Sequence, residues 1–514
     1  KDLVMGFKNV KFLDGSSKNN WEINNSDILK SEKKTRKHVL KIVYKADDYP
    51  VRLGEQSLRF EVRHGNGWGW DKKNDRERVE LKICCINKKI TWRKKMFSKF
   101  KRIKLAALAF ASVIAGGAVA DTINIAGWGA KSGPLRSFGI NSEAIIKAAI
   151  DRVNENGGVK LADGSMAKMS YDYYDSACNA EQGIAIARKV ASETNALIGI
   201  GPTCSGVAAA SFGVFQKKVG DSSDTGLQMP LLTDTAVRNG LAKISQWTFR
   251  NTPNEPDMYD KLFAWLRKTH PEIKTIYGGT ETDQGHSAGT YSIVIVQAAI
   301  RHGFEWVNGP IDEVTGQIGA GKANVLKSSS NWLMADTNFS VQARAFKKSG
   351  ADLFIVSSHP FSTCGFLKEL GRMKGMPKMM VGLTSSSSAE VMKGCPKQAE
   401  GMIIPTSFAP ITPAAKEVAA LAAANGGSAD LHSAASWENV MIIKDVIEAV
   451  GITGDPSKVN EERAKIRDGL EALETTEGLI GTVTRVQDEG EALKPFVFVH
   501  AKNGNWEVLH DPRN

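Results

Sequence analysis

Residues 196–206, ALIGIGPTCSG, decide the fold. The stretch begins with a short apolar run that ends in Gly201-Pro202, and such a run predicts a buried strand. Four small or polar residues, 203–206, follow, and residues 208–217 then predict a helix. A buried strand that leads directly into a helix is the repeating unit of a parallel sheet with right-handed crossovers.

The same alternation continues on both sides of this stretch. Apolar residues at Ile145, Ile146, Ala149, Ile150 and Val153 have the helical period, which predicts a helix over 143–154. Further strands are predicted at 122–129, 169–175, 229–235, 275–280, 352–357, 379–384 and 403–406, and further helices at 181–193, 288–302, 366–374 and 433–449. The last residues predict β-hairpin structure around an Asn503-Gly504 turn.

The pattern predicts an α/β fold with two doubly wound, parallel-sheet lobes, because it restarts after residues 250–253. We expect the first part of lobe 1 at 121–252, lobe 2 at 253–404, the second part of lobe 1 at 405–480, and a C-terminal β segment completing the lobes at 481–514. Ligands of such sheets bind beyond the carboxyl ends of the strands. Thr203, Ser205 and Gly206 lie there, immediately before a helix whose free N–H groups suit a carboxylate.

Residues 96–120 have the order of a signal peptide: a basic start, an apolar stretch and the small residues Ala118-Val119-Ala120. The apolar run 105–117 is too short to span a bilayer as a helix. We therefore expect a mature chain that begins at Asp121 and is exported to the periplasm. Residues 1–95 are expected to be a spurious or disordered prefix, with a real N-terminal extension as the alternative. Within them, 49–81 resembles the opening strands of jelly-roll polysaccharide lyases, through RFEVR followed by NDRERVEL.

The positive net charge of the chain, +11, comes from residues 1–120, which we call the leader. Residues 1–120 hold 28 of the 67 Lys and Arg and 13 of the 56 Asp and Glu, which leaves 39 positive against 43 negative residues from 121 onward. A basic chain would suggest nucleic acid as a partner. The mildly acidic remainder removes that inference, and no nucleic-acid partner is expected.

Four of the six cysteines follow the leader: Cys178, Cys204, Cys364 and Cys395. They form no CxxC pair and have no histidine at ligand spacing, so we expect no metal. An even number in an exported chain indicates disulfides, and four cysteines permit three connectivities. The sequence from 121 onward also lacks the nucleophile elbow, the P-loop, the HExxH helix and the dinucleotide fingerprint. We therefore expect no cofactor and no enzymatic activity.

The chain from 121 to 514 resembles the branched-chain amino acid binding proteins, which are type 1 periplasmic binding proteins of the leucine/isoleucine/valine kind. The resemblance rests on AKSGPLRSFG after the first strand, YDSAC, IGPTCSG, TPNEPD and the GNWEVL tail. It implies a Venus-flytrap fold with three hinge crossings that closes on a small ligand. It also supports a sequential disulfide pairing, since the family's cysteines matching Cys178 and Cys204 form a disulfide beside the pocket. Cys364 and Cys395 would then form the second one.

The resemblance implies a set of ligand contacts. Ser205 would hold a carboxylate, with Thr203 and Gly206 beside it, and the loop of Thr235, Ala236 and Val237 would contact the ammonium group of an amino acid. The remaining expected lining residues are Trp128, Phe138, His286, His359 and Ser385.

Two departures weaken the expectation of an aliphatic amino acid. Val237 stands where a Thr hydroxyl is usual, and the family's acid for the ammonium group has no clear match, Glu390 being the nearest carboxylate. The aromatic and histidine residues suit an aromatic or larger acid.

The expected function is therefore that of the solute-binding subunit of an ABC importer. It would capture a small carboxylate-bearing solute as a monomer and deliver it to a membrane permease. The alternatives are a periplasmic sensor that presents the ligand to a receptor or, from the prefix alone, a polysaccharide lyase fragment. A structural role stays open for individual residues: Ser205 as a helix N-cap, Phe138 and Trp128 as core, and the histidines as buried structural residues.

Overall fold

The computed structural model describes residues 122–513 except 309–329 and 426, and four strands in the segment before them. The chain divides into two compact units, Lys1–Ile114 and Ala115–Asn514. In the first, β1 (Trp21–Ile23) pairs antiparallel with β2 (Ile42–Tyr44), and β3 (Gln56–Arg63) with β4 (Arg76–Ile83). The expected signal peptide, and the expected prefix apart from these strands, lie outside the described residues.

The second unit begins with a six-stranded sheet in the order β10-β9-β8-β5-β7-β6. Its strands are β5 (Thr122–Gly129), β6 (Val159–Lys160), β7 (Met166–Asp175), β8 (Ile198–Ile200), β9 (Leu231–Thr233) and β10 (Thr248–Arg250). All of them run parallel except β6, which is antiparallel to β7. Because the chain starts in the middle and winds to both edges, this is a doubly wound sheet whose strand order reverses between β5 and β8.

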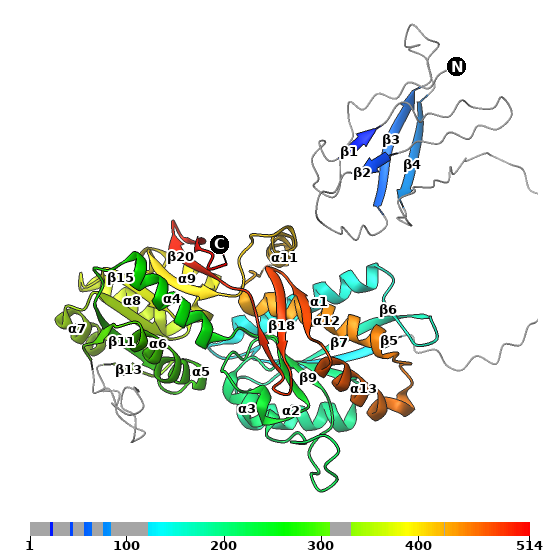
Figure 1. Cartoon of the computed structure of the whole chain (residues 1–514), viewed down its shortest axis with the longest axis horizontal. Coiled ribbons are helices and arrows are strands. Elements are labelled where there is room, and N and C mark those ends of the chain that lie inside the picture. The colour runs from blue at the N-terminus through cyan, green and yellow to red at the C-terminus, as the bar shows by residue number, and fades with distance from the viewer. Residues whose placement is uncertain are drawn as a thin grey trace, which may run out of the picture. The chain divides into compact units, whose positions relative to one another are not determined.

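Helices cover this sheet and complete what we call lobe 1, whose first part runs from cyan to green and whose second part is orange in Figure 1. They are α1 (Arg136–Glu155), α2 (Ala180–Glu193), α3 (Ser205–Phe212), α11 (Pro413–Ala424), α12 (Leu431–Val450) and α13 (Val459–Glu471). The apolar stripe predicted on α1 is buried along its whole length. The helix begins earlier than predicted, because Gly139 lets its first turn approach the backbone after β5. A Cβ at that position would lie 2.2 Å from the carbonyl oxygen of Ala130.

The second sheet has the order β12-β11-β14-β15-β16-β20-β21, with β13 also pairing with β11. Its strands are β11 (Thr275–Glu281), β12 (Glu305–Trp306), β13 (Asn331–Trp332), β14 (Leu353–Ser357), β15 (Met379–Gly382), β16 (Met402–Thr406), β20 (Val497–Lys502) and β21 (Asn505–His510). It is doubly wound around a reversal between β11 and β14. β20 and β21 extend the edge antiparallel, and they form the hairpin predicted around the Asn503-Gly504 turn.

Lobe 2, green and yellow in Figure 1, consists of this sheet and its helices. They are α4 (Glu255–Thr269), α5 (Gly285–Gly289), the π-helix η4 (Thr290–Ile295), α6 (Val296–Arg301), α7 (Ser340–Ser349), α8 (Pro360–Arg372), the 3-10 helix η5 (Thr384–Ser386), α9 (Ala389–Gly394) and α10 (Pro396–Ala399). The helix predicted at 366–374 begins six residues earlier, at Pro360, whose fixed φ suits the first turn of a helix.

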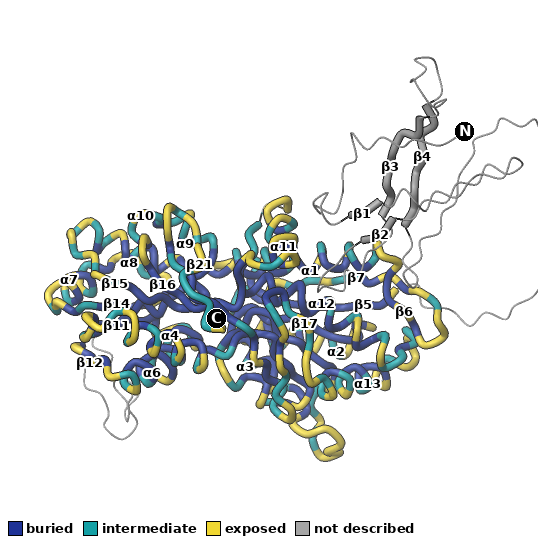
Figure 2. Tube along the Cα trace, turned by 45° about the horizontal axis from the view of Figure 1, so that its top comes forward, coloured by how far each residue is buried: buried dark blue, intermediate teal, exposed yellow. Residues whose placement is uncertain are grey.

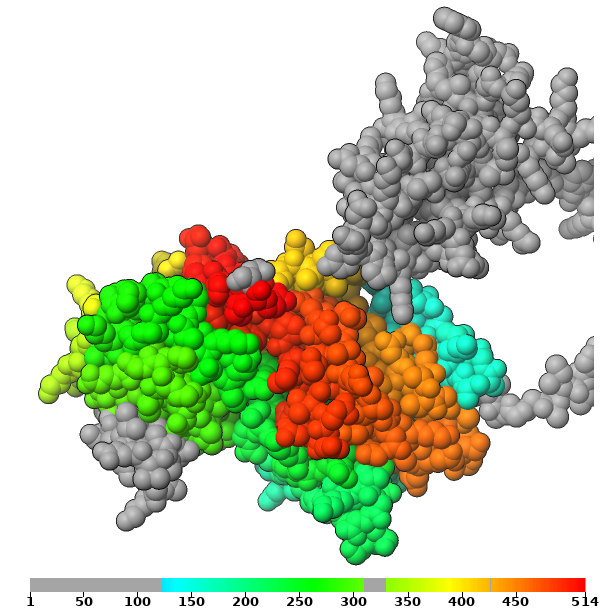
Figure 3. Space-filling model, viewed as in Figure 1, coloured from blue at the N-terminus to red at the C-terminus, as the bar shows by residue number. Residues whose placement is uncertain are grey.

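The chain passes between the lobes three times. The crossings are the segments 251–254 after β10, 407–412 after β16, and 494–496 before β20. The three-stranded sheet of β17 (Thr475–Gly478), β18 (Gly481–Val486) and β19 (Glu491–Leu493) precedes the third crossing. In Figure 3 this C-terminal part, red, lies where the green and orange lobes meet.

Each lobe has an apolar core of its own between sheet and helices, seen as dark blue strands under mixed helices in Figure 2. The deciding stretch 196–206 supplies the buried strand that was predicted, since β8 is fully buried. Gly199 lets Leu231 pack closely against this strand, because a Cβ would lie 2.5 Å from Leu231 Cδ1 and that side chain would have to move. Within the part of the chain that the structure describes, no helix is long and apolar enough to cross a membrane.

Candidate functional site

Both strand-order reversals are closed by a hydrogen bond between neighbouring strand ends. In lobe 1 the Ala130 N–H after β5 donates to Thr203 Oγ1 after β8, at 3.1 Å. In lobe 2 the His359 N–H after β14 donates to Oε1 of Glu281, the last residue of β11, at 3.0 Å. Ligands of doubly wound sheets bind in the crevice at such reversals.

A cavity lies between these two edges and takes its lining from both lobes. The space inside it that is open to a water-sized sphere is about 30 Å³. Small-molecule sites enclose roughly 300–1,000 Å³, so in this arrangement the lobes leave room for little more than water. Its lining residues are Leu135, Phe138, Thr203, Cys204, Ser205, Gly206, Thr235, Val237, Gln284, Gly285, His286, His359, Ser385 and His432.

Ser205 is the first residue of α3, which therefore starts three residues before the predicted 208. Cys204 holds the N-cap position and makes no side-chain cap, so the structure corrects the interpretation of Ser205 as an N-cap. Ser205 Oγ accepts a hydrogen bond from the Arg238 N–H at 3.2 Å, which leaves its own hydrogen free to donate. The first N–H groups of a helix have no intrahelical partner and carry positive partial charge. The start of α3 can therefore hold a carboxylate.

The other lobe 1 side chains surround this point. Phe138 is buried in the first turn of α1, and Thr235 Oγ1 is 3.1 Å from Ser142 Oγ. The Cys178–Cys204 disulfide is formed and fixes the residue before Ser205, while Cys364 and Cys395 form a second disulfide in lobe 2. This is the sequential pairing that was expected.

Arg250 holds the loop that carries Thr235 and Val237. Its guanidinium is fully buried and donates to the carbonyl oxygens of Val237 at 2.9 Å and Arg238 at 2.8 Å. It also pairs with Glu491 Oε2 at 2.9 Å. The floor of the cavity is thus tied to the first crossing and to the C-terminal β segment.

His359 belongs to a buried pair on the lobe 2 side. Its Nδ1 donates to Glu281 Oε2 at 2.6 Å, and the same carboxylate accepts from the hydroxyl groups of Ser362 and Ser287. Burial opposes ionisation of Glu281, but the attraction and hydrogen bonds of His359 outweigh it and lower its pKa below the ordinary 4.5. The carboxylate is therefore charged at neutral pH and holds the imidazole in place.

His286 forms a second pair of the same kind. Its Nε2 lies 2.9 Å from Glu255 Oε1, and the carboxylate also accepts from the hydroxyl groups of Thr290 and Thr384. Burial again opposes ionisation, and His286 together with these hydroxyl groups lowers the pKa of Glu255. The two imidazole rings lie 5.5 Å apart, centroid to centroid. Neither glutamate was proposed as a site residue, although Glu281 ends a strand at the reversal.

His432 was also missed, because it lies just before the helix predicted at 433. It stands in the first turn of α12 and contacts Phe138 edge to face, at 5.0 Å between ring centroids. Burial, with smaller contributions from His286 and His359, holds its pKa well below 6.5, so the ring is neutral. Leu135, Gln284 and Gly285 are the other lining residues that were not proposed as contacts.

Nine of the eleven expected contact residues line the cavity, and two do not. Trp128 and Ala236 are 0% and 1% exposed, behind the surface of lobe 1. Trp128 packs in the lobe core because its neighbour Gly199 leaves room for the indole. Phe361 on α8, an aromatic residue near the end of β14, is 54% exposed and does not line the cavity either. Glu390 pairs with Lys393 on α9, away from the lining, so it does not supply the missing acid.

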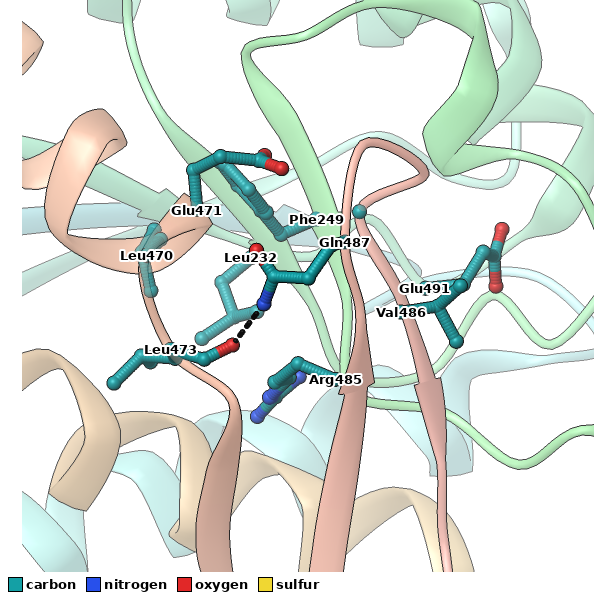
Figure 4. A pocket seen from close by; sticks show the side chains of 10 residues that line it. Leu232, Phe249, Leu470, Glu471, Leu473, Arg485, Val486, Gln487 and Glu491 are labelled. Atoms are coloured by element: carbon teal, nitrogen blue, oxygen red, sulfur yellow. Dashed lines mark hydrogen bonds between the residues drawn. The ribbon is translucent and has the colours of Figure 1, made fainter.

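A second hollow lies under the β18–β19 hairpin, where α13 and the edge of the lobe 1 sheet meet it (Figure 4). Gln487 Nε2 donates to the Leu473 carbonyl at 2.7 Å, Arg485 to the Arg250 carbonyl at 3.1 Å, and Glu491 pairs with Arg250. Arg485 Nε is buried without a partner among the described residues, but only about 10 Å³ inside the hollow is open to a water-sized sphere. Because none of its lining comes from lobe 2, the cavity between the lobes is the better candidate. The described residues contain no cluster of His, Cys, Asp or Glu suited to a metal ion.

Comparison with known proteins agrees with this architecture. The model of a family described as periplasmic binding protein matches residues 122–505. The leucine-, isoleucine-, valine-, threonine- and alanine-binding protein of Pseudomonas aeruginosa is 24% identical over 405 residues, which cover 76% of this chain and 93% of that protein.

Two solved structures share the fold. One is a branched-chain amino acid transporter substrate-binding protein from Streptococcus pneumoniae in complex with isoleucine, with a TM-score of 0.60, 17% identity, and coverage of 75% of this chain and 98% of that one. The other is a solute-binding protein of an ABC transporter from Rhodopseudomonas palustris in complex with 3,4-dihydroxybenzoic acid, with a TM-score of 0.60, 12% identity, and coverage of 76% and 96%.

Proposed function

The chain belongs to the periplasmic binding protein family, and from this premise we propose that it is the solute-binding subunit of an ABC importer. Its family and relatives are solute-binding proteins and not enzymes. In this proposal the protein captures a small carboxylate-bearing solute between its lobes, as a monomer, and delivers it to a membrane permease. The bound solutes of similar structures, an amino acid in one case and a dihydroxybenzoic acid in another, both carry a carboxylate.

The free end of α3 in the cavity is the observation that carries the proposal. The Ser205 hydroxyl and the first N–H groups of the helix meet at one edge of a cavity whose other edge belongs to lobe 2. A solute held at α3 and touched by lobe 2 favours the closed state through contacts that the open state lacks. Closure would then be the signal that the permease reads.

We further propose that residues 96–120 direct export and are removed, so that the working protein begins at Asp121 in the periplasm. The basic, apolar and small-residue order of this segment supports it. Sequencing the N-terminus of the exported protein tests it, with Asp121 as the expected first residue. A product that retains residues before 96 would contradict it.

Thermal unfolding of the purified protein with single solutes tests the capture itself. A ligand that binds only the folded state stabilises it by about 2.7 kcal/mol at a hundredfold excess over Kd. We expect such a shift with a small carboxylic acid and none with the corresponding primary amide, which lacks the anionic oxygen pair. A panel of amino acids, aromatic acids and aliphatic acids that leaves the melting temperature unchanged throughout would refute the proposal.

A further inference from the structure

The cavity presents no carboxylate to a ligand. None of its lining side chains is an aspartate or a glutamate. The glutamates behind its histidines, Glu255 and Glu281, are 1% and 0% exposed and accept three and four hydrogen bonds from protein groups. An ammonium group placed here would lose its water without gaining an anionic partner, which is unfavourable.

The histidines offer polar ring nitrogens in its place. Each glutamate binds one ring nitrogen and leaves the opposite one facing away from it. These opposite atoms are His286 Nδ1 and His359 Nε2, and neither has a hydrogen-bond partner among the described residues. A ligand hydroxyl suits such a nitrogen, because a hydroxyl can both donate and accept, and the two ring centroids are 5.5 Å apart.

Two further polar atoms of the lining are buried and unpaired. Ser385 Oγ and His432 Nδ1 have no hydrogen-bond partner in the described part of the chain, and their residues are 2% and 3% exposed. Buried polar atoms are almost always paired in folded proteins. Ser385 belongs to lobe 2 and His432 to lobe 1, so the unpaired atoms point to a ligand that carries polar atoms toward both lobes.

The middle of the cavity is apolar and shaped by ring edges. Leu135, Phe138 and Val237 provide its apolar side chains. Phe138 meets His432 at 86° and His359 at 72°, with centroids 5.0 and 6.5 Å away. Aromatic rings in such arrangements favour a further ring, stacked or edge to face.

We propose that the ligand is a hydroxylated aromatic monocarboxylic acid without an amino group. Resting on the proposed function, this places the carboxylate at Ser205 and the start of α3, the ring beside Phe138, and the hydroxyl end at His286 and His359. The ligand then bridges a lobe 1 donor and the lobe 2 ring nitrogens, so that its two ends together hold the lobes closed.

Calorimetry of the purified protein with a matched series tests this. The series is 3,4-dihydroxybenzoate, 4-hydroxybenzoate, benzoate, terephthalate, phenylalanine and leucine. We expect at least one hydroxylated acid to bind ten times more tightly than benzoate, with terephthalate no better than benzoate and both amino acids weaker than it. A preference for terephthalate, for unsubstituted benzoate or for an amino acid would overturn the inference while leaving carboxylate capture intact. Failure of all six, and of aliphatic acids, would instead count against the proposed function.

A substitution of His359 tests whether this residue causes the preference for hydroxylated acids. His359→Asn keeps a donor for Glu281 but removes the opposite ring nitrogen, Nε2. We expect it to lower the affinity ratio of hydroxylated acid to benzoate at least fivefold while changing benzoate affinity less than threefold. His302→Asn, a half-buried histidine outside the lining, should leave the ratio unchanged. An unchanged ratio in a folded His359→Asn protein would contradict the assignment, and should that variant not fold, the ligand series on the natural protein still decides.

Discussion

Lys494 on the third crossing and Glu438 on α12 form an ion pair whose side chains are 1% and 4% exposed. Glu438 Oε2 also accepts from Asn251 Nδ2 at 2.9 Å, and its Oε1 from the Leu479 N–H at 2.7 Å. Lys494 Nζ donates in addition to the Asn251 carbonyl at 3.2 Å. Because Asn251 lies on the first crossing, this pair joins two crossings to the long helix of lobe 1.

Lys494→Met should destabilise the protein strongly, because it leaves the Glu438 carboxylate buried without its cation. Breaking one side of a buried pair costs about 3–5 kcal/mol. The free energy of unfolding from urea titration measures it. Lys502→Met is the matched control, since Lys502 is half exposed and its pair with Glu507 spans 3.3 Å. Similar small losses in both variants would show that the buried pair does not hold the crossings.

Ser205→Ala should weaken binding of the captured acid by about 1.5–3 kcal/mol, the usual contribution of a hydrogen bond to a charged group. Ser211→Ala is the control on the same helix. Ser211 is fully buried and its hydroxyl has no partner among the described residues, but it does not line the cavity. Calorimetry should find its affinity unchanged. Equal affinities of the two variants would remove Ser205 from the site.

Removing either disulfide should lower the stability of the protein, but only removal of Cys178–Cys204 should weaken ligand binding. Their sequence separations are 26 and 31, so on the chain-entropy model removing either lowers the free energy of unfolding by about 3–4 kcal/mol. The double variant Cys178→Ala/Cys204→Ala should also weaken ligand binding, because Cys204 lines the cavity and precedes Ser205. Cys364→Ala/Cys395→Ala should keep its affinity. Loss of binding in the second variant alone would contradict this.

Asp352 should contribute to stability in a pH-dependent way. It accepts from Lys378 Nζ at 2.8 Å and from the Lys274 and Thr275 N–H groups at 3.1 and 3.2 Å, and these bonds hold its pKa well below the ordinary value. Because the pKa of Asp352 is lower in the folded state, its charged carboxylate contributes its full stabilisation above the unfolded-state pKa of about 3.9. This contribution is lost as the pH falls through the folded-state pKa.

Unfolding of the natural protein and Asp352→Asn at several pH values checks this contribution. The difference in the free energy of unfolding should be constant from pH 7 to pH 5 and should shrink below about pH 3.9. Asp151→Asn, which removes an exposed carboxylate without a partner among the described residues, should change stability by less than about 0.5 kcal/mol at neutral pH. If the difference in unfolding free energy between the natural protein and Asp352→Asn grew as the pH fell, the prediction would be wrong.

The fold could be predicted from the sequence because its signals are local. The buried run before Thr203 and the stripe of α1 each specify one element and its buried face. The first residues of the helices were predicted less accurately, since α3 and α8 begin three and six residues before the predicted positions. The early start of α1 depends on a close approach at Gly139 that only the tertiary structure reveals.

The lobe 1 half of the site was predictable and the lobe 2 half only in part. Ser205 and Thr203 follow a strand directly, so their position comes from one segment. The pairs His286–Glu255 and His359–Glu281 join residues 31 and 78 positions apart, and no spacing rule connects them. The histidines were found without the carboxylates that orient them, and Trp128 was overestimated because its burial depends on Gly199 of another strand.

A crystal structure of the protein with the tightest-binding acid of the thermal panel tests the central claim most directly. The account predicts the carboxylate within hydrogen-bonding distance of Ser205 Oγ and the N–H groups at the start of α3, with the opposite end of the ligand against His286 and His359. A ligand under the β18–β19 hairpin, or one between the lobes whose carboxylate does not reach α3, would contradict it.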